Sequence, residues 1–154
     1  MLDLLIKGGL IVDGSGSPGH YAAVGVQGDT LRVLRGDLSS IDSARVLDAT
    51  GKIVTPGLID LHTHVFRGDN HRNPDEISGI EAGVTSLVDA GGAGPDDIEK
   101  FKSVIADAKT TVYSFLGSFS RQAGAWEQLA TDRIPETAAA NHDLVRGVKI
   151  HSMP

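Results

Sequence analysis

The chain has 154 residues, of which 40% are hydrophobic and 5% aromatic, and its formal net charge is −6. This length suffices for one ordinary domain with a hydrophobic core. The sequence has no basic stripe, which argues against a nucleic-acid partner. No apolar run approaches the roughly 20 residues that span a bilayer, so no membrane segment is expected. The sequence contains no cysteine, which excludes disulfides, thiolate zinc sites and thiol nucleophiles within it.

The first 55 residues are predicted to form a small all-β unit. Short apolar stretches alternate here with turn-forming Gly, Asp and Ser residues, a pattern typical of short strands. The expected strands are residues 4–7, 10–12, 22–26, 31–34, 45–47 and 52–54. The N-terminus lacks the basic stretch and the small-residue cleavage site of a signal peptide, so a cytoplasmic location is expected.

After residue 55 the pattern changes to an alternation of strands and helices, which predicts an α/β fold with a parallel sheet. Strands are expected at residues 58–62, 84–90, 112–119 and 148–151, with helices at 74–83, 95–109 and 137–144. The strand centres lie about 27, 28 and 34 residues apart, and an eight-unit barrel of ~250 residues averages ~31 residues per unit. We therefore expect two domains, a β-sandwich segment at 1–55 and the first four βα units of a (β/α)8 barrel, a half barrel, at 56–154.

Two histidines end the first expected barrel strand. His62 and His64 are separated by one residue, and residues i and i+2 of a strand point to the same face, roughly 6–7 Å apart. They can therefore offer two imidazole nitrogens to one metal ion. The strand is apolar on both sides of the pair, as in a buried parallel sheet, and the carboxyl ends of barrel strands are where such folds place their chemistry.

The fourth expected strand contains a lysine that alternation turns inward. Val148 and Ile150 share one face, suited to packing against helices, so Lys149 and His151 share the other. Burying an ammonium group is costly, and the lysine can either pair with a carboxylate or become a neutral amine with a lowered pKa. A neutral amine can react with CO2, and the resulting carbamate can bridge two metal ions.

Two further histidines are candidates for substrate contact. His71 lies in the loop after the first barrel strand, and loops at that end form the mouth of an active site. His151 follows Lys149 on the same face of its strand. A solvated polar residue is the simpler explanation of either position, and substrate contact stays the alternative.

A resemblance to a known family rests on four stretches of sequence. They are Pro56-Gly57-Leu58-Ile59-Asp60-Leu61-His62-Thr63-His64, Gly83-Val84-Thr85-Ser86-Leu87-Val88-Asp89-Ala90-Gly91-Gly92-Ala93-Gly94, Phe115-Leu116 and Gly147-Val148-Lys149. The first stretch and the lysine resemble the amidohydrolase superfamily of metal-dependent hydrolases. The other stretches are similar to its dihydroorotase-like deacetylase branch. The resemblance covers essentially the whole chain and implies a (β/α) barrel with a small β-sandwich built partly from the N-terminal segment.

The resemblance also implies roles for individual residues. It makes His62 and His64 ligands of one metal ion and Lys149 the carrier of a carbamate that bridges two divalent ions. Zinc is favoured, because it binds imidazole and carboxylate-type oxygen. Asp60 takes the acidic position of the motif and is expected to support the ligands. The two later histidines and the catalytic aspartate of the family have no counterpart in these 154 residues.

The expected reaction is hydrolysis of an amide or ester bond in a small acyl compound by a metal-activated hydroxide. A dihydroorotase- or hydantoinase-like cyclic amidase is the alternative within the same family. A D-aminoacylase that bridges its metals through cysteine is disfavoured, because the chain has none. A truncated, inactive fragment is the alternative from another class, since a half barrel exposes edge strands. We expect little activity from these residues alone, and homo-oligomerisation stays open.

Overall fold

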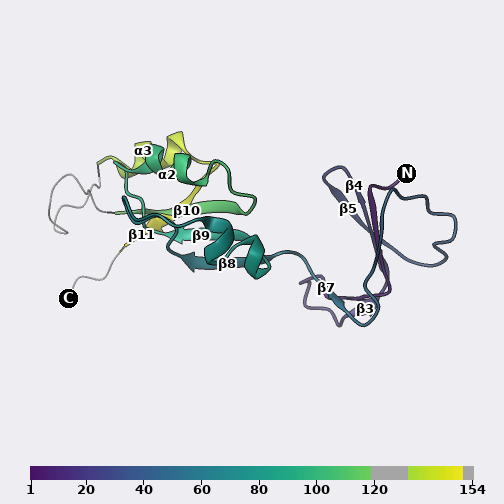
Figure 1. Cartoon of the computed structure of the whole chain (residues 1–154). Helices are drawn as coiled ribbons and strands as arrows, with labels where there is room; N and C mark the ends of the chain where they lie inside the picture. Colours follow the sequence, from purple (N-terminus) through teal and green to yellow (C-terminus); the bar gives the residue numbers. More distant parts are fainter. Residues whose placement is uncertain (119–131, 151–154) are drawn as a thin grey trace. The chain divides into compact units, whose positions relative to one another are not determined.

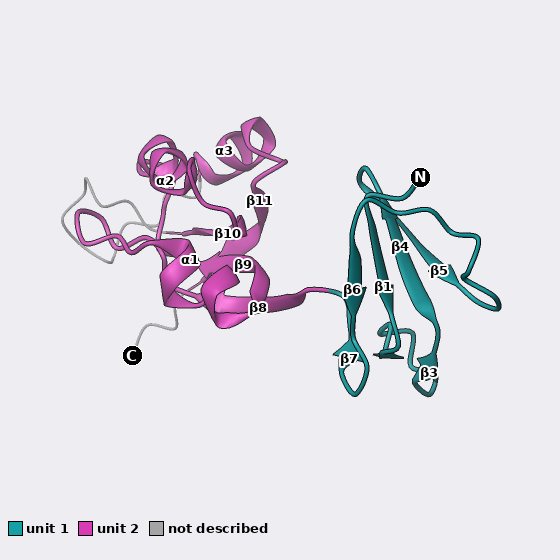
Figure 2. Ribbon diagram, turned by 45° about the vertical axis from the view of Figure 1, so that its right-hand side comes forward, with its two compact units in different colours: residues 1–56 teal, residues 57–154 magenta. Residues whose placement is uncertain are grey.

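A computed structural model describes residues 1–118 and 132–150 of the chain. It divides into two compact units, Met1–Pro56 and Gly57–Pro154, coloured separately in Figure 2. Their status as separate domains stays a prediction. None of the helices in the described ranges is long and apolar enough to cross a membrane.

The first unit consists of short strands in two sheets. The strands are β1 (Leu4–Lys7), β2 (Leu10–Ile11), β3 (His20–Tyr21), β4 (Ala23–Gln27), β5 (Thr30–Leu34), β6 (Val46–Asp48) and β7 (Ile53–Val54). One sheet has the order β5-β4-β1-β6 and the other the order β3-β2-β7. Both mix parallel and antiparallel pairs. Leu5, Ile11 and Ala23 are buried in this unit, as the apolar stretches of the sequence predict.

The second unit is built on a parallel sheet. Its strands are β8 (Leu58–Thr63), β9 (Val84–Ala90), β10 (Thr111–Gly117) and β11 (Val145–Lys149), in the order β11-β10-β9-β8. Its helices are α1 (Pro74–Ile77), α2 (Ile98–Ile105) and α3 (Ile134–Ala140), with a 3-10 turn η1 (Ile80–Ala82). Every strand pair is parallel and joins strands consecutive in sequence, which confirms the predicted α/β class.

The first predicted helix, at 74–83, is shorter in the structure than expected. It starts as the sequence indicates, because the Asn73 side chain accepts a hydrogen bond from the Asp75 amide at 3.0 Å and Pro74 occupies the first turn. It ends at Ile77, and η1 follows. The Ile80 amide donates to the Thr110 hydroxyl at 2.8 Å. A contact 30 residues away in sequence therefore takes the amide that a continuous helix would have used.

The hydrophobic core lies between the sheet and helices α2 and α3, which Figure 1 shows on the same side of the sheet. Phe101 of α2 is fully buried and packs edge-to-face on Phe66, with ring centroids 5.9 Å apart. Ile98 completes the apolar side of α2, as its helical spacing predicts. The sheet contributes buried Val112, Leu116 and Val145 to the same cluster.

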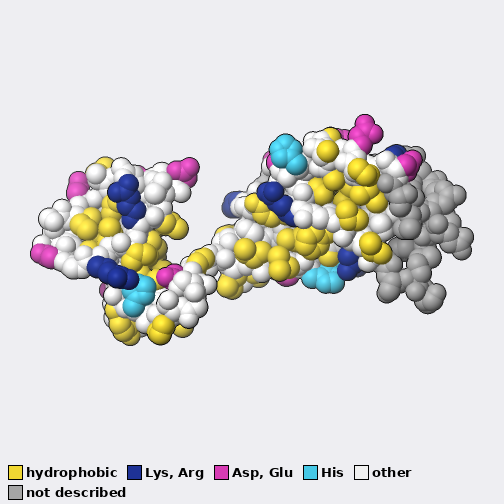
Figure 3. All heavy atoms as spheres, turned by 180° about the vertical axis from the view of Figure 1, so that it is seen from behind, with side chains coloured by type: hydrophobic (Ala, Val, Ile, Leu, Met, Phe, Trp, Pro, Cys, Tyr) yellow, Lys and Arg dark blue, Asp and Glu magenta, His cyan; other side chains and the backbone are white. Residues whose placement is uncertain are grey.

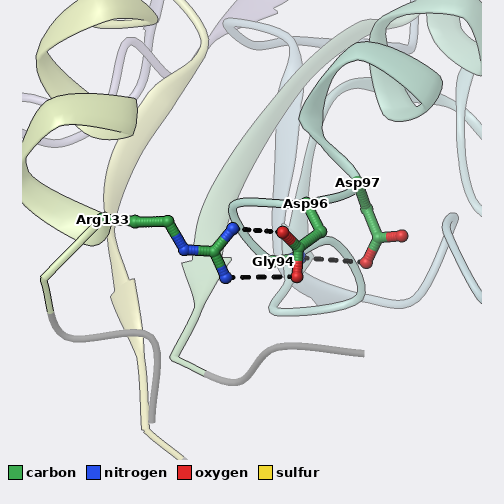
Figure 4. Close-up of polar contacts among 4 residues, drawn as sticks. All are labelled: Gly94, Asp96, Asp97 and Arg133. Atoms are coloured by element: carbon green, nitrogen blue, oxygen red, sulfur yellow. Dashed lines mark hydrogen bonds and ion pairs between the residues drawn. The ribbon is translucent and has the colours of Figure 1, made fainter. Parts of the chain in front are cut away.

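An ion pair joins the two helices that cover this core. Arg133, just before α3, binds the carboxylate of Asp96, just before α2, with both ends of its guanidinium (Figure 4). The Asp96 side chain is only 7% exposed, and its hydrogen bond to the guanidinium, together with its charge, raises the pKa of Arg133. The neighbouring Asp97 carboxylate accepts from the Gly94 amide at 3.4 Å. A bidentate pair of this kind fixes direction as well as distance.

The two outer strands of the sheet are more exposed than the sequence predicts. Leu58, Ile59 and Leu61 of β8 are about 60% exposed, and Val148 and Ile150 are 45% and 75% exposed. The expectation of a first strand buried on both sides was therefore wrong for this structure, as was that of Val148 and Ile150 packed under helices. The cause is their position, since β8 and β11 are the edges of the sheet. Figure 3 shows hydrophobic side chains at the surface of both units.

The buried hydroxyl of Ser114 leads to a stability prediction. Its oxygen has no hydrogen-bond partner, unlike the other buried side-chain polar atoms of the described residues. We expect Ser114→Ala to leave the free energy of unfolding unchanged or to raise it by about 1 kcal/mol, because no hydrogen bond is lost. Urea denaturation measures this.

The matched control is Thr110→Val, which also removes one buried hydroxyl. Thr110 Oγ1 donates to Asp75 at 2.6 Å and accepts from the Ile80 amide, so this change should lower the free energy of unfolding by about 1–3 kcal/mol. An equal loss in both variants would contradict the prediction for Ser114.

Candidate metal centre

The two predicted ligand histidines lie together at the carboxyl end of β8. His62 is the second-last residue of the strand, and His64 directly follows its last residue. Their ring centroids are 5.3 Å apart and their planes meet at 75°, an edge-on arrangement. His62 is exposed and His64 is half-buried. The structure thus brings the two imidazoles side by side, while their role as ligands stays a prediction.

The surroundings of His64 favour its neutral form. Burial lowers the pKa of His64 below its ordinary value of 6.5, and the buried Asp89 carboxylate opposes this shift. The positive charges of His62, Arg67 and Lys149 lower the pKa further. A neutral imidazole is the form that binds a metal ion. His64 therefore takes up a proton at a lower pH than an ordinary histidine.

The strand register places Lys149 on the face of the sheet opposite the helices. Lys149 pairs with Gly117 and Val148 pairs with Leu116, which lies in the core beneath α2 and α3. Paired residues of parallel strands point the same way and neighbours alternate. Lys149 therefore points away from the helices, as the sequence pattern predicts, and its half-buried amine contributes to the field at His64.

His62 lies on the same face of the sheet as Lys149. Thr63 pairs with Asp89, and Asp89 pairs with Ser114, which shares the helix side with Leu116. His62 precedes Thr63 and so lies on the opposite face, with Lys149. The histidine pair and the lysine come from the two outermost strands of the sheet, at the same carboxyl edge.

Asp60 supports His62 through the main chain. Its carboxylate accepts from the His62 amide at 3.0 Å and from the Ser78 hydroxyl at 2.8 Å. The first of these hydrogen bonds, helped by the second, lowers the pKa of Asp60. An ionised Asp60 thus ties the end of β8 to the turn after α1, and its hydrogen bond is to the backbone of His62 rather than to its ring.

The structure does not bring His71 together with the histidine pair. His71 lines a cavity of about 370 Å³ beside the end of α2, together with Arg72, Asp107 and Ala108, and neither His62 nor His64 borders this cavity. His151 lies outside the described residues.

Asp89 is a buried acid that the sequence reasoning missed. It is fully buried in β9, and burial raises the pKa of its carboxyl group. One oxygen accepts from the Phe66 amide at 2.9 Å and the other from the Gly92 amide at 2.6 Å. The signal was available, because an aspartate within the apolar stretch Val84–Ala90 needs a partner if the strand is buried.

The described residues contain no grouped set of three metal ligands. Within residues 1–118 and 132–150, no three His, Cys, Asp or Glu side chains are grouped so that they could hold a metal ion. The role of His62, His64 and Lys149 in metal binding therefore stays a prediction.

Comparisons with known proteins point in the same direction. No protein-family model matches the chain. A D-aminoacylase of Alcaligenes xylosoxydans xylosoxydans is 43% identical over 88 residues, covering 56% of this chain and 17% of the relative. A deacetylase of Agrobacterium fabrum is 33% identical over 123 residues, covering 72% of this chain and 30% of the relative.

Two solved structures are similar to this chain in fold. A dihydroorotase superimposes with a TM-score of 0.75 at 27% identity, covering 94% of this chain and 41% of its own. A D-aminoacylase described for its binuclear metal centre superimposes with a TM-score of 0.62 at 26% identity, covering 94% and 36%. The chain belongs to the amidohydrolase superfamily. This amidohydrolase chain spans less than a third of the two curated relatives, which contain long stretches without a counterpart in it.

The lowered pKa of His64 predicts a pH-dependent loss of stability. The unfolded chain takes up a proton at this histidine near pH 6.5, whereas the folded chain resists protonation until lower pH. Stability should therefore fall as the pH drops through 6.5, and His64→Gln should weaken this fall. Urea denaturation of both proteins at pH 7.5 and 5.5 measures the free energy of unfolding. An equal fall in the two proteins would contradict the lowered pKa of His64.

Proposed function

We propose that this chain is part of a metal-dependent hydrolase that cleaves an amide or ester bond of a small acyl compound, in the manner of a deacetylase. One observation carries the proposal. His62 and His64 lie edge-on at the carboxyl end of β8, on the face of a parallel sheet that Lys149 shares. Relatives named as D-aminoacylases and deacetylases support this reading.

The donor set suits a divalent metal ion. Two imidazoles favour zinc among the abundant divalent metals, although other transition ions bind them as well. The binuclear centre in the D-aminoacylase relative supports a pair of ions held in part by His62, His64 and Lys149. Bound metal ions would supply Lewis acidity toward an acyl carbonyl and toward water.

The residues of the chain prepare this chemistry in three ways. His64 stays neutral and so keeps a nitrogen lone pair available. Asp60 fixes the main chain of His62. The Lys149 ammonium is proposed to lose one proton to solvent, and the neutral amine to add to the carbon of CO2 and release a second proton, which leaves a carbamate anion. Two oxygens that can bind metal ions then take the place of a positive charge.

The finer architecture belongs to the same proposal. The four strands with their helices correspond to the first four units of a (β/α)8 barrel, and residues 1–55 to a segment of a β-sandwich domain. The substrate is a small molecule, with no nucleic-acid or membrane partner. A cytoplasmic location and a homo-oligomer are further proposals.

Two alternatives each have an observation in their favour. The structural match to a dihydroorotase favours cleavage of a cyclic amide. The absence of a third grouped ligand among the described residues favours a fragment without catalysis. Assays of cyclic and linear amides on a chain extended to the length of the relatives separate these readings.

Zinc binding to the purified chain tests the proposal directly. Isothermal titration should show binding that weakens at least about 10-fold in His62→Ala and in His64→Ala, because each change removes one ligand. The control is His20→Ala, which removes a histidine from β3 in the first unit and should leave zinc affinity unchanged. Equal affinities in all four proteins would refute the proposed site.

The chain by itself is expected to hydrolyse acyl esters barely above the rate in buffer. The reason is that its described residues supply only part of a ligand set. Turnover of p-nitrophenyl acetate with added zinc measures this. Robust turnover that disappears in His62→Ala would show that these 154 residues are catalytically sufficient.

A further inference from the structure

The carboxylate of Asp89 links two loops at the carboxyl edge of the sheet. Its side chain is fully buried, and each of its oxygens accepts a hydrogen bond from a different loop. Phe66, which donates at 2.9 Å, lies two residues after His64. Gly92, which donates at 2.6 Å, lies two residues after the end of β9. One side chain therefore connects the segment that follows the histidine pair to the neighbouring strand.

The two loops approach so closely that their contact requires a glycine. A Cβ atom at Gly92 would lie 2.2 Å from the Phe66 carbonyl oxygen and 2.7 Å from Asp89 Oδ1. Both distances are far below van der Waals contact. On its other side, the fully buried Phe66 ring packs edge-to-face on Phe101 of α2. The residue two positions after His64 is thus held by the carboxylate, by Gly92 and by Phe101.

Packing alone does not account for an acid at this position. The neighbouring Leu87 and Val88 are buried at 0% and 4% exposure, so an apolar side chain would suit the environment. Burying a carboxylate is costly unless its oxygens are satisfied. Asp89 meets this cost by accepting two backbone hydrogen bonds, and those bonds define where the chain runs after β8.

We infer that Asp89 is a positioning residue for the His62–His64 pair. By fixing the backbone at Phe66, it sets the direction in which the chain leaves β8 and therefore the orientation of the His64 ring. Its significance for metal binding rests on the function proposed above, whereas its effect on His64 orientation does not.

The test compares Asp89→Asn with Asp75→Asn in the full 154-residue chain. Asp75 is a matched control, because its carboxylate also accepts backbone hydrogen bonds, from Lys109 at 3.0 Å and Thr110 at 2.8 Å. Those bonds join α1 to the loop before β10 and touch neither Phe66 nor Gly92. Both variants lose one charge and keep the shape of the side chain.

The first readout needs no metal. NMR measures hydrogen exchange at the Phe66 amide and the three-bond couplings that report χ1 of His64. We expect Asp89→Asn to speed Phe66 exchange at least about tenfold and to average the His64 couplings, since a hydrogen bond to a charged acceptor is weakened. Asp75→Asn should change exchange at Lys109 and Thr110 only. Unchanged values at Phe66 and His64 in Asp89→Asn overturn the inference.

The second readout is zinc affinity by isothermal titration. We expect Asp89→Asn to weaken binding about 10- to 100-fold, as for other residues that orient ligands, while Asp75→Asn leaves it unchanged. If the His64 couplings change but the wild type binds zinc no better than His62→Ala, the proposed function fails and the positioning role stands. If zinc binds through both histidines and Asp89→Asn has no effect on affinity or couplings, the positioning role fails alone.

Two measurements keep the inference open to refutation if Asp89→Asn does not fold. Gly92→Ala keeps the Asp89 carboxylate chemically intact but pushes a Cβ atom against it and against the Phe66 carbonyl oxygen, and should average the same His64 couplings. In the wild type, the Phe66 and Gly92 amides should exchange as slowly as the amides of β9. Faster exchange at either position would overturn the inference whatever the variants do.

Discussion

Parallel hydrogen bonding among β8, β9, β10 and β11 is the constraint on which the candidate site depends. Parallel strands end at a common edge, so residues 62 and 149, which are 87 positions apart in sequence (149 − 62), share one edge and one face. Consecutive pairing also places the helical connections over a single side of the sheet, as Figure 1 shows for α2 and α3. Crossovers of one hand between consecutive parallel strands leave the opposite face to His62 and Lys149.

Much of this arrangement was predictable because it depends on local patterns. The stretch Val84–Ala90 is a strand with the predicted bounds, and the alternation of strands and helices predicted the strand order. Alternation over the last residues of each strand is enough to predict His62 and Lys149 on one face, although β11 as a whole contains a bulge. The family was also recognisable, since each of the stretches that carry the resemblance is continuous in sequence.

The remaining features depend on contacts distant in sequence. The helix after Asn73 ends before Gly79, and the Thr110 hydroxyl, distant in sequence, binds the Ile80 amide beyond the break. β11 begins at Val145 rather than Val148, because its first residues pair with Ser114 across a register shift. Asp89 could be suspected from an acid in an apolar strand, but its partners at Phe66 and Gly92 are visible only in three dimensions. The exposure of β8 depends on which strands flank it, which local alternation does not encode.

The register shift in β11 decides on which face of the sheet Lys149 lies. Val145 pairs with Ser114 and Gly147 with Phe115, so Arg146 is an extra residue and Val145 and Val148 both face the helices. Without the bulge at Arg146, strict alternation from Val145 would point the ammonium group of Lys149 into the hydrophobic core beneath α2 and α3. Placing an unpaired charge there is far more costly than a bulge. The charge of Lys149 therefore favours the bulged register of the final strand over the strictly alternating one.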